Sequence, residues 1–405
     1  MSDQAATARR GGTGLAIGIC FLVAALEGYD IQAFGVAAPH FVPELGINPA
    51  QQGMAGSIAM VGLVAAAFLG GWLADRLGRK PVLVGSVLIF GLGSIWTSLV
   101  HGYDPLLAAR FVTGLGFGAA LPNLIAMAAE LSSPARRGAT TSAMFCGMPA
   151  GGTAVALFAK AAGASVDWRM IFLAGGVLPL IIVPLMIFLL PETRPPGSVT
   201  APKEKQTLKP LFSNRRAVPT LLLWVGNFLT LVVLYLLLNW LPTLVAQGHS
   251  PTDGATASLV FNIFGIIGAL LLGFAVDRYG FRWSLLLTYG ALAAVMAAMA
   301  SAAQISALLA LSAAAGFLVH ACLYSLYGVP PRMYPRQAYA TGAGLAVGIG
   351  RFGSIVGPLL AGYLRNGGWS PGQVFGALLP VALVAGATVF LLTFLTPLGR
   401  DPPEV

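Results

Sequence analysis

Long apolar runs separated by short polar breaks dominate the pattern along this chain. About twelve runs approach the roughly 20 residues that a helix needs to cross the hydrocarbon layer of a membrane. The breaks between them are rich in Gly, Pro or charge, which end helices or stay in water. The pattern therefore predicts an all-α polytopic membrane protein with spans at 14–39, 53–74, 81–100, 105–131, 139–161, 170–190, 218–246, 254–276, 284–302, 305–329, 340–364 and 373–395.

A short polar signature follows the second predicted span and recurs after the eighth. It reads Gly-Trp-Leu-Ala-Asp-Arg-Leu-Gly-Arg-Lys over 71–80 and Gly-Phe-Ala-Val-Asp-Arg-Tyr-Gly-Phe-Arg over 273–282. The offset of 202 residues is half of the 405-residue chain. A half-length repeat in an apolar chain predicts two pseudo-symmetric six-helix lobes with a substrate path at their interface. The lobes are expected at 1–190 and 218–405, joined by a charged, Pro-rich linker at 191–217.

Composition and charge placement support a membrane protein. Charged residues make up 9% of the chain and mean hydropathy is +0.81, whereas soluble domains carry roughly 25% charged residues. Most of the 23 Lys and Arg residues fall on one side of a twelve-span topology. By the positive-inside rule, the linker and both termini are expected in the cytoplasm. The net charge of +9 is thus a topology signal and does not indicate nucleic-acid binding.

Two acids in the first predicted span are candidates for proton coupling. Glu27 and Asp30 are three residues apart, so they occupy neighbouring positions on one helix face. Ionisable groups at this depth are costly and are functional candidates by default. Two close carboxylates cannot both stay ionised cheaply in a low dielectric, so one is expected to hold a proton near neutral pH. The alternative is a structural pair of salt bridges, to Arg110 and to another group of the same lobe.

Two arginines, Arg110 and Arg351, also lie within predicted spans. A guanidinium binds a carboxylate through two parallel hydrogen bonds, a geometry that lysine cannot copy. Arg351 is the preferred anchor for an anionic substrate, and Arg110 is the preferred partner of Asp30. The reverse assignment, with the two arginines exchanged, stays open on sequence alone.

Polar and aromatic residues in the spans are candidate substrate contacts. An aromatic ligand needs ring faces for stacking and a few polar groups for its substituents. A lone histidine in a membrane span is as readily a packing residue, and that reading stays open for His320. The candidates besides Arg351 are Gln32, Phe34, Asn123, Asn227, Tyr235, Asn239, Trp240, His320 and Tyr324.

The repeated signature resembles that of the major facilitator superfamily. The resemblance implies a cytoplasmic gate, in which Asp75 caps the end of span two near the start of span eleven. Glu130 is expected to pair with Arg79 or with Arg136 and Arg137, and a solvated surface position without a pairing role stays open for it. The second copy departs from the first, because Phe281 stands in the place of Arg79. The expected gate residues are Gly71, Asp75, Arg76, Gly78, Arg79, Glu130, Arg136, Asp277 and Arg278.

A narrower resemblance lies in span one, where Glu27-Gly28-Tyr29-Asp30 is similar to an element of the aromatic acid/proton symporters. In this element Glu27 stands in place of the commoner Asp, which resembles the branch of the family that carries 3-(3-hydroxyphenyl)propionate. Further matching stretches are 110–123, 146–152, 239–242 and 350–362. The resemblance implies alternating-access import of a small aromatic carboxylate with protons across a bacterial inner membrane. It also implies a functional monomer in the lipid bilayer, with no cofactor besides the coupling proton.

Two other function classes stay open. A drug or metabolite proton antiporter is the first, although 146–152 fits the exporter element of span five only in part. A membrane-embedded enzyme or sensor is the second and is remote, because the sequence shows no zinc-type His cluster, nucleophile elbow or phosphate loop. The three cysteines lie far apart in apolar spans, so neither a disulfide framework nor a metal site is expected.

Overall fold

The computed structural model describes residues 2–133, 137–163, 166–193, 208–213 and 215–396. Within these ranges every regular element is a helix. The helices are α1 (Ser2–Glu44), α2 (Pro49–Leu77), α3 (Arg79–Ser98), α4 (Tyr103–Leu131), α5 (Arg137–Ala162), α6 (Trp168–Leu189), α7 (Lys209–Phe212), α8 (Ala217–Ala246), α9 (Pro251–Tyr279), α10 (Phe281–Ser301), α11 (Ile305–Tyr327), α12 (Pro330–Met333), α13 (Arg336–Asn366) and α14 (Pro371–Leu395).

The chain forms two compact units. The first comprises residues 1–47 and 58–199, and the second comprises residues 48–57 and 200–405. The start of α2 therefore packs with the second unit, where Gln52 Nε2 donates to Thr243 Oγ1 over 3.1 Å. In the same segment the Ser57 hydroxyl donates to the Ile355 carbonyl over 2.7 Å.

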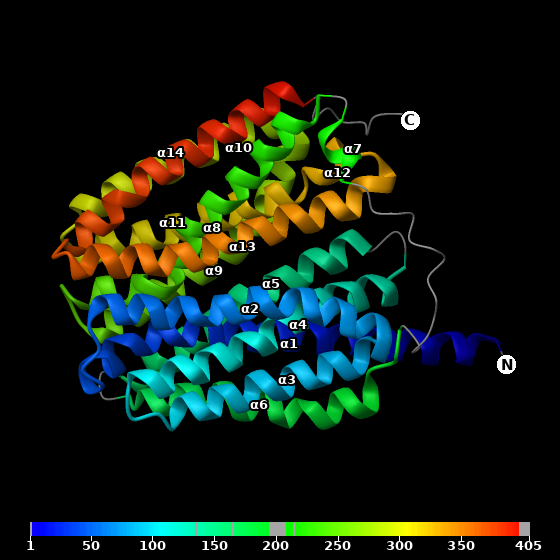
Figure 1. Cartoon of the computed structure of the whole chain (residues 1–405), viewed down its shortest axis with the longest axis horizontal. Coiled ribbons are helices and arrows are strands. Elements are labelled where there is room, and N and C mark those ends of the chain that lie inside the picture. Colours follow the sequence, from blue (N-terminus) through cyan, green and yellow to red (C-terminus); the bar gives the residue numbers. More distant parts are fainter. Residues whose placement is uncertain (1, 134–136, 164–165, 194–207, 214, 397–405) are drawn as a thin grey trace. The chain divides into compact units, whose positions relative to one another are not determined.

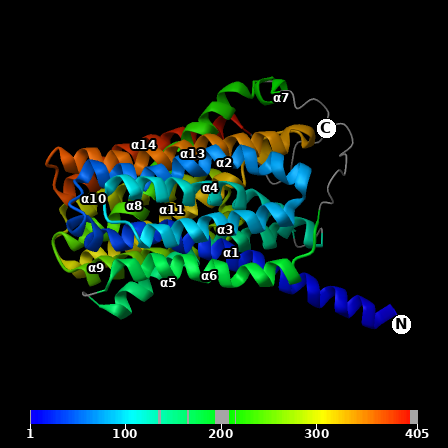
Figure 2. The ribbon, with the colours of Figure 1, turned by 60° about the horizontal axis from the view of Figure 1, so that its bottom comes forward.

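Small residues bring the helices of the first unit close together. Helix α1 packs against α4, α5 and α6, and α3 lies between α4 and α6 (Figure 2). At the α1–α5 contact an added Cβ on Gly151 would collide with the Ala25 carbonyl. Such close backbone approach is how membrane helices gain packing energy, since the lipid supplies no hydrophobic drive between them. It also holds Asp30 on α1 beside the other helices of the unit.

The second unit uses the same device around α8. This helix packs against α9, α11, α13 and α14, and α10 lies along α14 (Figure 1). An added Cβ on Gly353 of α13 would collide with the Phe228 carbonyl of α8. Nearby, Trp240 Nε1 donates to the carbonyl of Pro358 over 3.1 Å. These contacts fix the face of α13 that carries Arg351.

Each of the twelve spans expected from the apolar pattern corresponds to one long helix. Eleven of the helices in the described residues are long and apolar enough to cross a membrane. The remaining expected span, 139–161, falls on the 26-residue α5. Helix α7 lies inside the expected linker and was not foreseen; its Leu211 is buried and accepts a hydrogen bond from Thr220 Oγ1 over 2.8 Å.

Candidate functional site

A buried ion pair joins α1 to α4 in the first unit. Arg110 Nη1 lies 2.9 Å from Asp30 Oδ2, and the two side chains are 1% and 0% exposed. The rings of Phe34 and Phe172 each lie 5.6 Å from the guanidinium carbon, so the charges are enclosed by aromatic groups. The expected pairing of Arg110 with Asp30 is confirmed. Their role in proton coupling stays a prediction.

The hydroxyl of Ser94 completes the surroundings of Asp30. Ser94 Oγ, on α3, is within hydrogen-bond distance of Asp30 Oδ1 and lies 2.9 Å from the Phe172 carbonyl oxygen on α6. The sequence offered no signal for this residue, because a serine in an apolar helix usually bonds to its own backbone. The Asp30 side chain of α1 is thus bonded to α3 and α4, and Ser94 links it further to α6.

Three other candidates of the first unit are buried: Glu27, Gln32 and Asn123. Glu27 is fully buried on α1, one turn before Asp30. Gln32 Nε2 donates to the Met148 carbonyl of α5 over 3.4 Å. Asn123 Nδ2 bonds to the Ala119 carbonyl of its own helix over 2.8 Å. The structure brings Phe34 to Arg110 but leaves Asn123 without a described contact to the Asp30 pair.

Arg351 of the second unit faces a phenol. Its Nη1 donates to the hydroxyl of Tyr235 on α8 over 3.0 Å, and Arg351 is 9% exposed. Tyr327 of α11 lies within electrostatic reach of both groups. A guanidinium next to two phenols is suited to hold a carboxylate, because the phenol hydroxyls donate to the same oxygens.

A line of rings along α11 leads away from Arg351. The ring centroids of Tyr324 and Tyr327 are 6.2 Å apart, and those of His320 and Tyr324 are also 6.2 Å apart. His320 then packs edge-on to Phe261 of α9 at 5.4 Å, and its Nδ1 lies 2.9 Å from the Gly316 carbonyl oxygen. His320 is therefore engaged in packing between α9 and α11, although its ring continues the aromatic surface.

The polar candidates of α8 differ in whether they keep a hydrogen-bonding atom for a ligand. Asn239 donates to the Tyr235 carbonyl over 2.9 Å, and Trp240 is bonded to Pro358. Asn227 Nδ2 donates to the Leu223 carbonyl over 3.0 Å, whereas its fully buried Oδ1 has no hydrogen-bond partner among the described residues. An unsatisfied buried acceptor is costly, so Asn227 Oδ1 is a candidate ligand contact.

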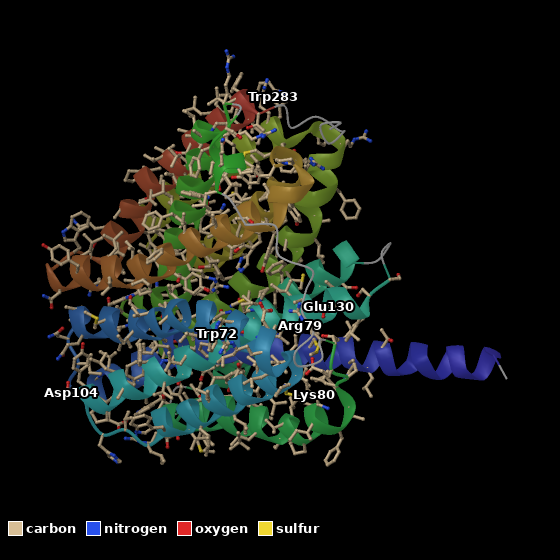
Figure 3. The ribbon with its side chains drawn as sticks, turned by 45° about the vertical axis from the view of Figure 1, so that its right-hand side comes forward. Trp72, Arg79, Lys80, Asp104, Glu130 and Trp283 are labelled. Atoms are coloured by element: carbon tan, nitrogen blue, oxygen red, sulfur yellow. The ribbon has the colours of Figure 1, made fainter. Side chains whose placement is uncertain are left out.

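Charges gather at one end of the first unit, where the signature lies. Figure 3 shows Arg79, Lys80 and Glu130 near this end and Asp104 at the other. Arg79 Nη2 lies 2.7 Å from Glu130 Oε1, which confirms the first of the two pairings expected for Glu130. Arg136 and the side chain of Asp277 lie outside the described residues.

Glu192 is a functional candidate that sequence reasoning missed. Its Oε1 and Oε2 accept hydrogen bonds from the backbone N–H groups of Arg79 and Lys80, over 2.9 and 3.1 Å. A carboxylate at this place satisfies the free donors of the first turn of α3 and interacts favourably with the helix dipole. Gly78, with φ of 96°, makes the turn that exposes these donors. The Pro-Glu pair directly after span six was the sequence feature that could have pointed to this carboxylate.

At the second copy of the signature, a cation–π contact and a hydrogen bond to a backbone carbonyl join the helices. Phe281 stands 202 residues after Arg79, and Arg332 stands 202 residues after Glu130. The guanidinium carbon of Arg332 lies 4.5 Å from the Phe281 ring centroid, so a cation–π contact occupies the place of the ion pair. Arg282 Nη2 donates to the Thr393 carbonyl of α14 over 3.1 Å.

The remaining gate candidates lie along the two signatures. Arg76 stacks over Trp72 at 4.0 Å, and the exposed Arg278 lies 5.7 Å from the Tyr279 ring centroid. Asp75 and Gly71 are half-buried near the end of α2. The gate role of Asp75 stays a prediction.

Comparison with known proteins places these features in a family. The family model described as Major Facilitator Superfamily matches residues 20–269 and 246–404. A 3-(3-hydroxyphenyl)propionate transporter of Escherichia coli is 41% identical over 93% of both chains. A 4-hydroxybenzoate transporter of Pseudomonas aeruginosa is 36% identical, covering 92% of this chain and 91% of the relative. A gallate transporter of Pseudomonas putida is 32% identical, covering 85% and 84%.

A solved structure shares the fold. It is a bacterial homologue of the human lysosomal transporter Spinster, which matches with a TM-score of 0.78 at 16% identity and covers 96% of this chain and 99% of its own. The sequence relatives carry aromatic acids, and none of those reported is an enzyme. This chain is a multi-pass transporter that belongs to the Major Facilitator Superfamily, among its aromatic acid transporters.

Proposed function

We propose that this protein is a proton-coupled symporter that imports a small aromatic carboxylate, hydroxyphenylpropionate-like or hydroxybenzoate-like, by alternating access. The observation that carries the proposal is the ionisable pair of Asp30 and Arg110, buried in the membrane-spanning part of the first unit. A buried acid beside an arginine and a hydroxyl is a candidate proton acceptor, because burial favours the protonated form of a carboxyl group and a neighbouring arginine favours the ionised form.

Energetics favour coupling to at least one proton. Moving a monoanion inward against about 100 mV costs roughly 2.3 kcal/mol. One co-transported proton neutralises the moving charge, and a second adds electrical drive. Asp30 and Glu27 together allow either stoichiometry, with protons as the coupling ion and no other cofactor.

The second unit supplies the contacts for the anion and the ring. Arg351, with the Tyr235 hydroxyl at 3.0 Å, is the proposed carboxylate site. Tyr324 and His320 offer ring faces, and the unsatisfied Oδ1 of Asn227 is the proposed acceptor for a ring hydroxyl. Asn227 precedes Tyr235 by two helical turns, about 12 Å of rise. Tyrosine side chains on helices lean toward the N-terminus, which brings the phenol back toward Asn227.

The test is uptake into proteoliposomes that contain only this protein. Labelled 3-(3-hydroxyphenyl)propionate and 4-hydroxybenzoate are offered with the outside more acidic, and again with a protonophore present. The proposal expects uphill uptake of at least one acid that the protonophore abolishes. Uptake driven only by an acidic interior would favour the antiporter, and uptake indifferent to protons would refute the coupling.

We further propose an inner-membrane location with both termini and the 191–217 linker in the cytoplasm, acting as a monomer. The charge asymmetry of the loops supports this orientation. Reporter fusions after Ala5 and after Ser198 are expected to report an internal position in bacterial cells. A fusion after Asp104, in the first turn of α4 at the end opposite Arg79, serves as the matched external control (Figure 3). An external signal at Ser198 would contradict the lobe assignment.

A further inference from the structure

Two hydrogen-bond contacts of Ser94, one to Asp30 and one to Phe172, share a single proton when Asp30 is ionised. Ser94 Oγ lies within hydrogen-bond distance of two acceptors, Asp30 Oδ1 and the Phe172 carbonyl oxygen. A serine hydroxyl has one proton to donate, and a carbonyl oxygen can only accept. With Asp30 ionised, Ser94 can therefore make only one of the two bonds in full. With a proton on Oδ1, Asp30 donates to Ser94 and Ser94 donates to Phe172, so both bonds form.

We propose that Ser94 is a positioning residue that relays the protonation state of Asp30 to α6. When a proton binds Oδ1, the Ser94 hydroxyl turns to the Phe172 carbonyl and ties α1 to α6 through α3. When the proton leaves, Ser94 turns back to the carboxylate and the tie to α6 is released. Oδ2 stays on Arg110 in both states, and only the proton on Oδ1 is exchanged. The inference rests on the proposed proton coupling.

Among the described groups around Asp30, Ser94 is the one whose hydrogen bonding can change when Asp30 gains or loses a proton. Arg110 is the charged group from α4, and it is held on Oδ2. On α1 itself, Glu27 lies one turn away and the Tyr29 hydroxyl donates to the Ile171 carbonyl over 3.3 Å. On α5, which also packs against α1, the thiol of Cys146 is half-buried. From α6 the contacts to Ser94 are the Phe172 carbonyl and Gly175.

Gly175 gives the hydroxyl room to turn. An added Cβ there would lie 3.2 Å from Ser94 Oγ and 3.2 Å from Tyr29 Cε1. These distances are tight for a carbon atom, so Gly175→Ala would crowd the hydroxyl without removing it. The substitution therefore perturbs the relay from α6, independently of any change at position 94.

The experiment compares Ser94→Ala with a matched serine on the same helix. Ser86 is also buried on α3, but its hydroxyl donates to its own helix, to the Val82 carbonyl over 2.7 Å. Ser94→Ala removes the hydroxyl at Asp30, Ser94→Thr restores one, and Ser86→Ala controls for loss of a buried hydroxyl. Two quantities are measured: the pH profile of labelled 3-(3-hydroxyphenyl)propionate uptake, and the acid-minus-alkaline infrared spectrum of the purified protein. The carboxylic-acid band of Asp30 is identified by its loss in Asp30→Asn.

In Ser94→Ala we expect the pH of half-maximal uptake to move upward by about half a unit or more. An ionised carboxylate loses more from a missing donor than a neutral acid does. The infrared band should move to higher frequency, because the acid proton has lost its acceptor. Ser94→Thr should restore both values in part, Gly175→Ala should shift the band in the same direction, and Ser86→Ala should change neither.

Two kinds of failure are distinguishable. If Asp30 titrates and drives uptake but Ser94→Ala and Gly175→Ala both behave like Ser86→Ala, the relay is refuted and the symport proposal stands. If Asp30→Asn removes no titrating band and changes no proton-driven uptake, the proposed function fails at its first step. Should Ser94→Ala not fold, the band in Gly175→Ala and Ser94→Thr decides, because neither variant removes the hydroxyl.

Discussion

Asp30→Asn is expected to abolish accumulation driven by a pH gradient while substrate exchange continues. The amide mimics the protonated acid in shape and leaves nothing at this position to titrate. The variant should therefore lose the roughly tenfold accumulation that one pH unit can drive per proton. Counterflow needs no net proton movement, so it should survive better than uphill uptake. Both are measured in proteoliposomes with the same labelled aromatic acid.

The buried partner of Asp30 calls for a matched control. Asp30→Asn leaves the guanidinium of Arg110 buried without its counter-charge, and breaking such a pair costs about 3 to 5 kcal/mol. A double variant, Asp30→Asn with Arg110→Gln, removes both charges and should recover expression without recovering coupling. Retained pH-driven accumulation in Asp30→Asn, together with its loss in Glu27→Gln, would place the proton site one helical turn earlier. Coupling that survives both changes would end the symport mechanism.

Arg351→Lys is expected to weaken substrate binding although the charge is kept. A lysine loses the planar fork that holds a carboxylate through two hydrogen bonds, and it also loses the fixed geometry toward Tyr235. The expected loss is about 1 to 3 kcal/mol, the value of a hydrogen bond to a charged group. That corresponds to roughly five- to 150-fold in the dissociation constant, measured on purified protein by calorimetry.

A second arginine of the same helix serves as the control for Arg351. Arg365 lies near the end of α13, where it donates to the Trp369 carbonyl, so Arg365→Lys changes the same side chain away from the candidate site. Its affinity should equal that of the unaltered protein. If Arg351→Lys also bound normally while Arg110→Lys did not, the roles assigned to the two arginines would have to be exchanged.

The sequence predicted the fold and the charged partners because those features leave strong patterns. A span needs a long apolar run, so the helices could be placed from hydropathy alone. A buried acid needs a compensating charge, and Arg110 lies in a span of the same lobe, which made its pairing with Asp30 the preferred one. The Arg79–Glu130 contact was one of two pairings expected for Glu130, from opposite charges at the ends of the spans.

What the sequence did not reveal depends on how helices turn and pack against each other. Ser94 is one of several hydroxyls on α3, and those of Ser86 and Thr97 bond to their own helix. Only the packing of α3 against α1 and α6 distinguishes Ser94 from them. Glu192 comes from a span end that is 113 positions from Arg79, and nothing in local spacing connects the two. The position of the Tyr235 phenol beside Arg351 likewise follows from the α8–α13 contact.

The two halves of the repeat should respond differently to ionic strength. The Arg79–Glu130 pair is partly exposed, 17% and 39% for the two side chains, so dissolved ions can screen it over a Debye length of about 8 Å. Its counterpart, Arg332 on the Phe281 ring, pairs a charge with a quadrupole and a buried apolar surface, which salt weakens far less. Raised salt is therefore expected to weaken the Arg79–Glu130 ion pair of the first repeat more than the Arg332–Phe281 contact of the second.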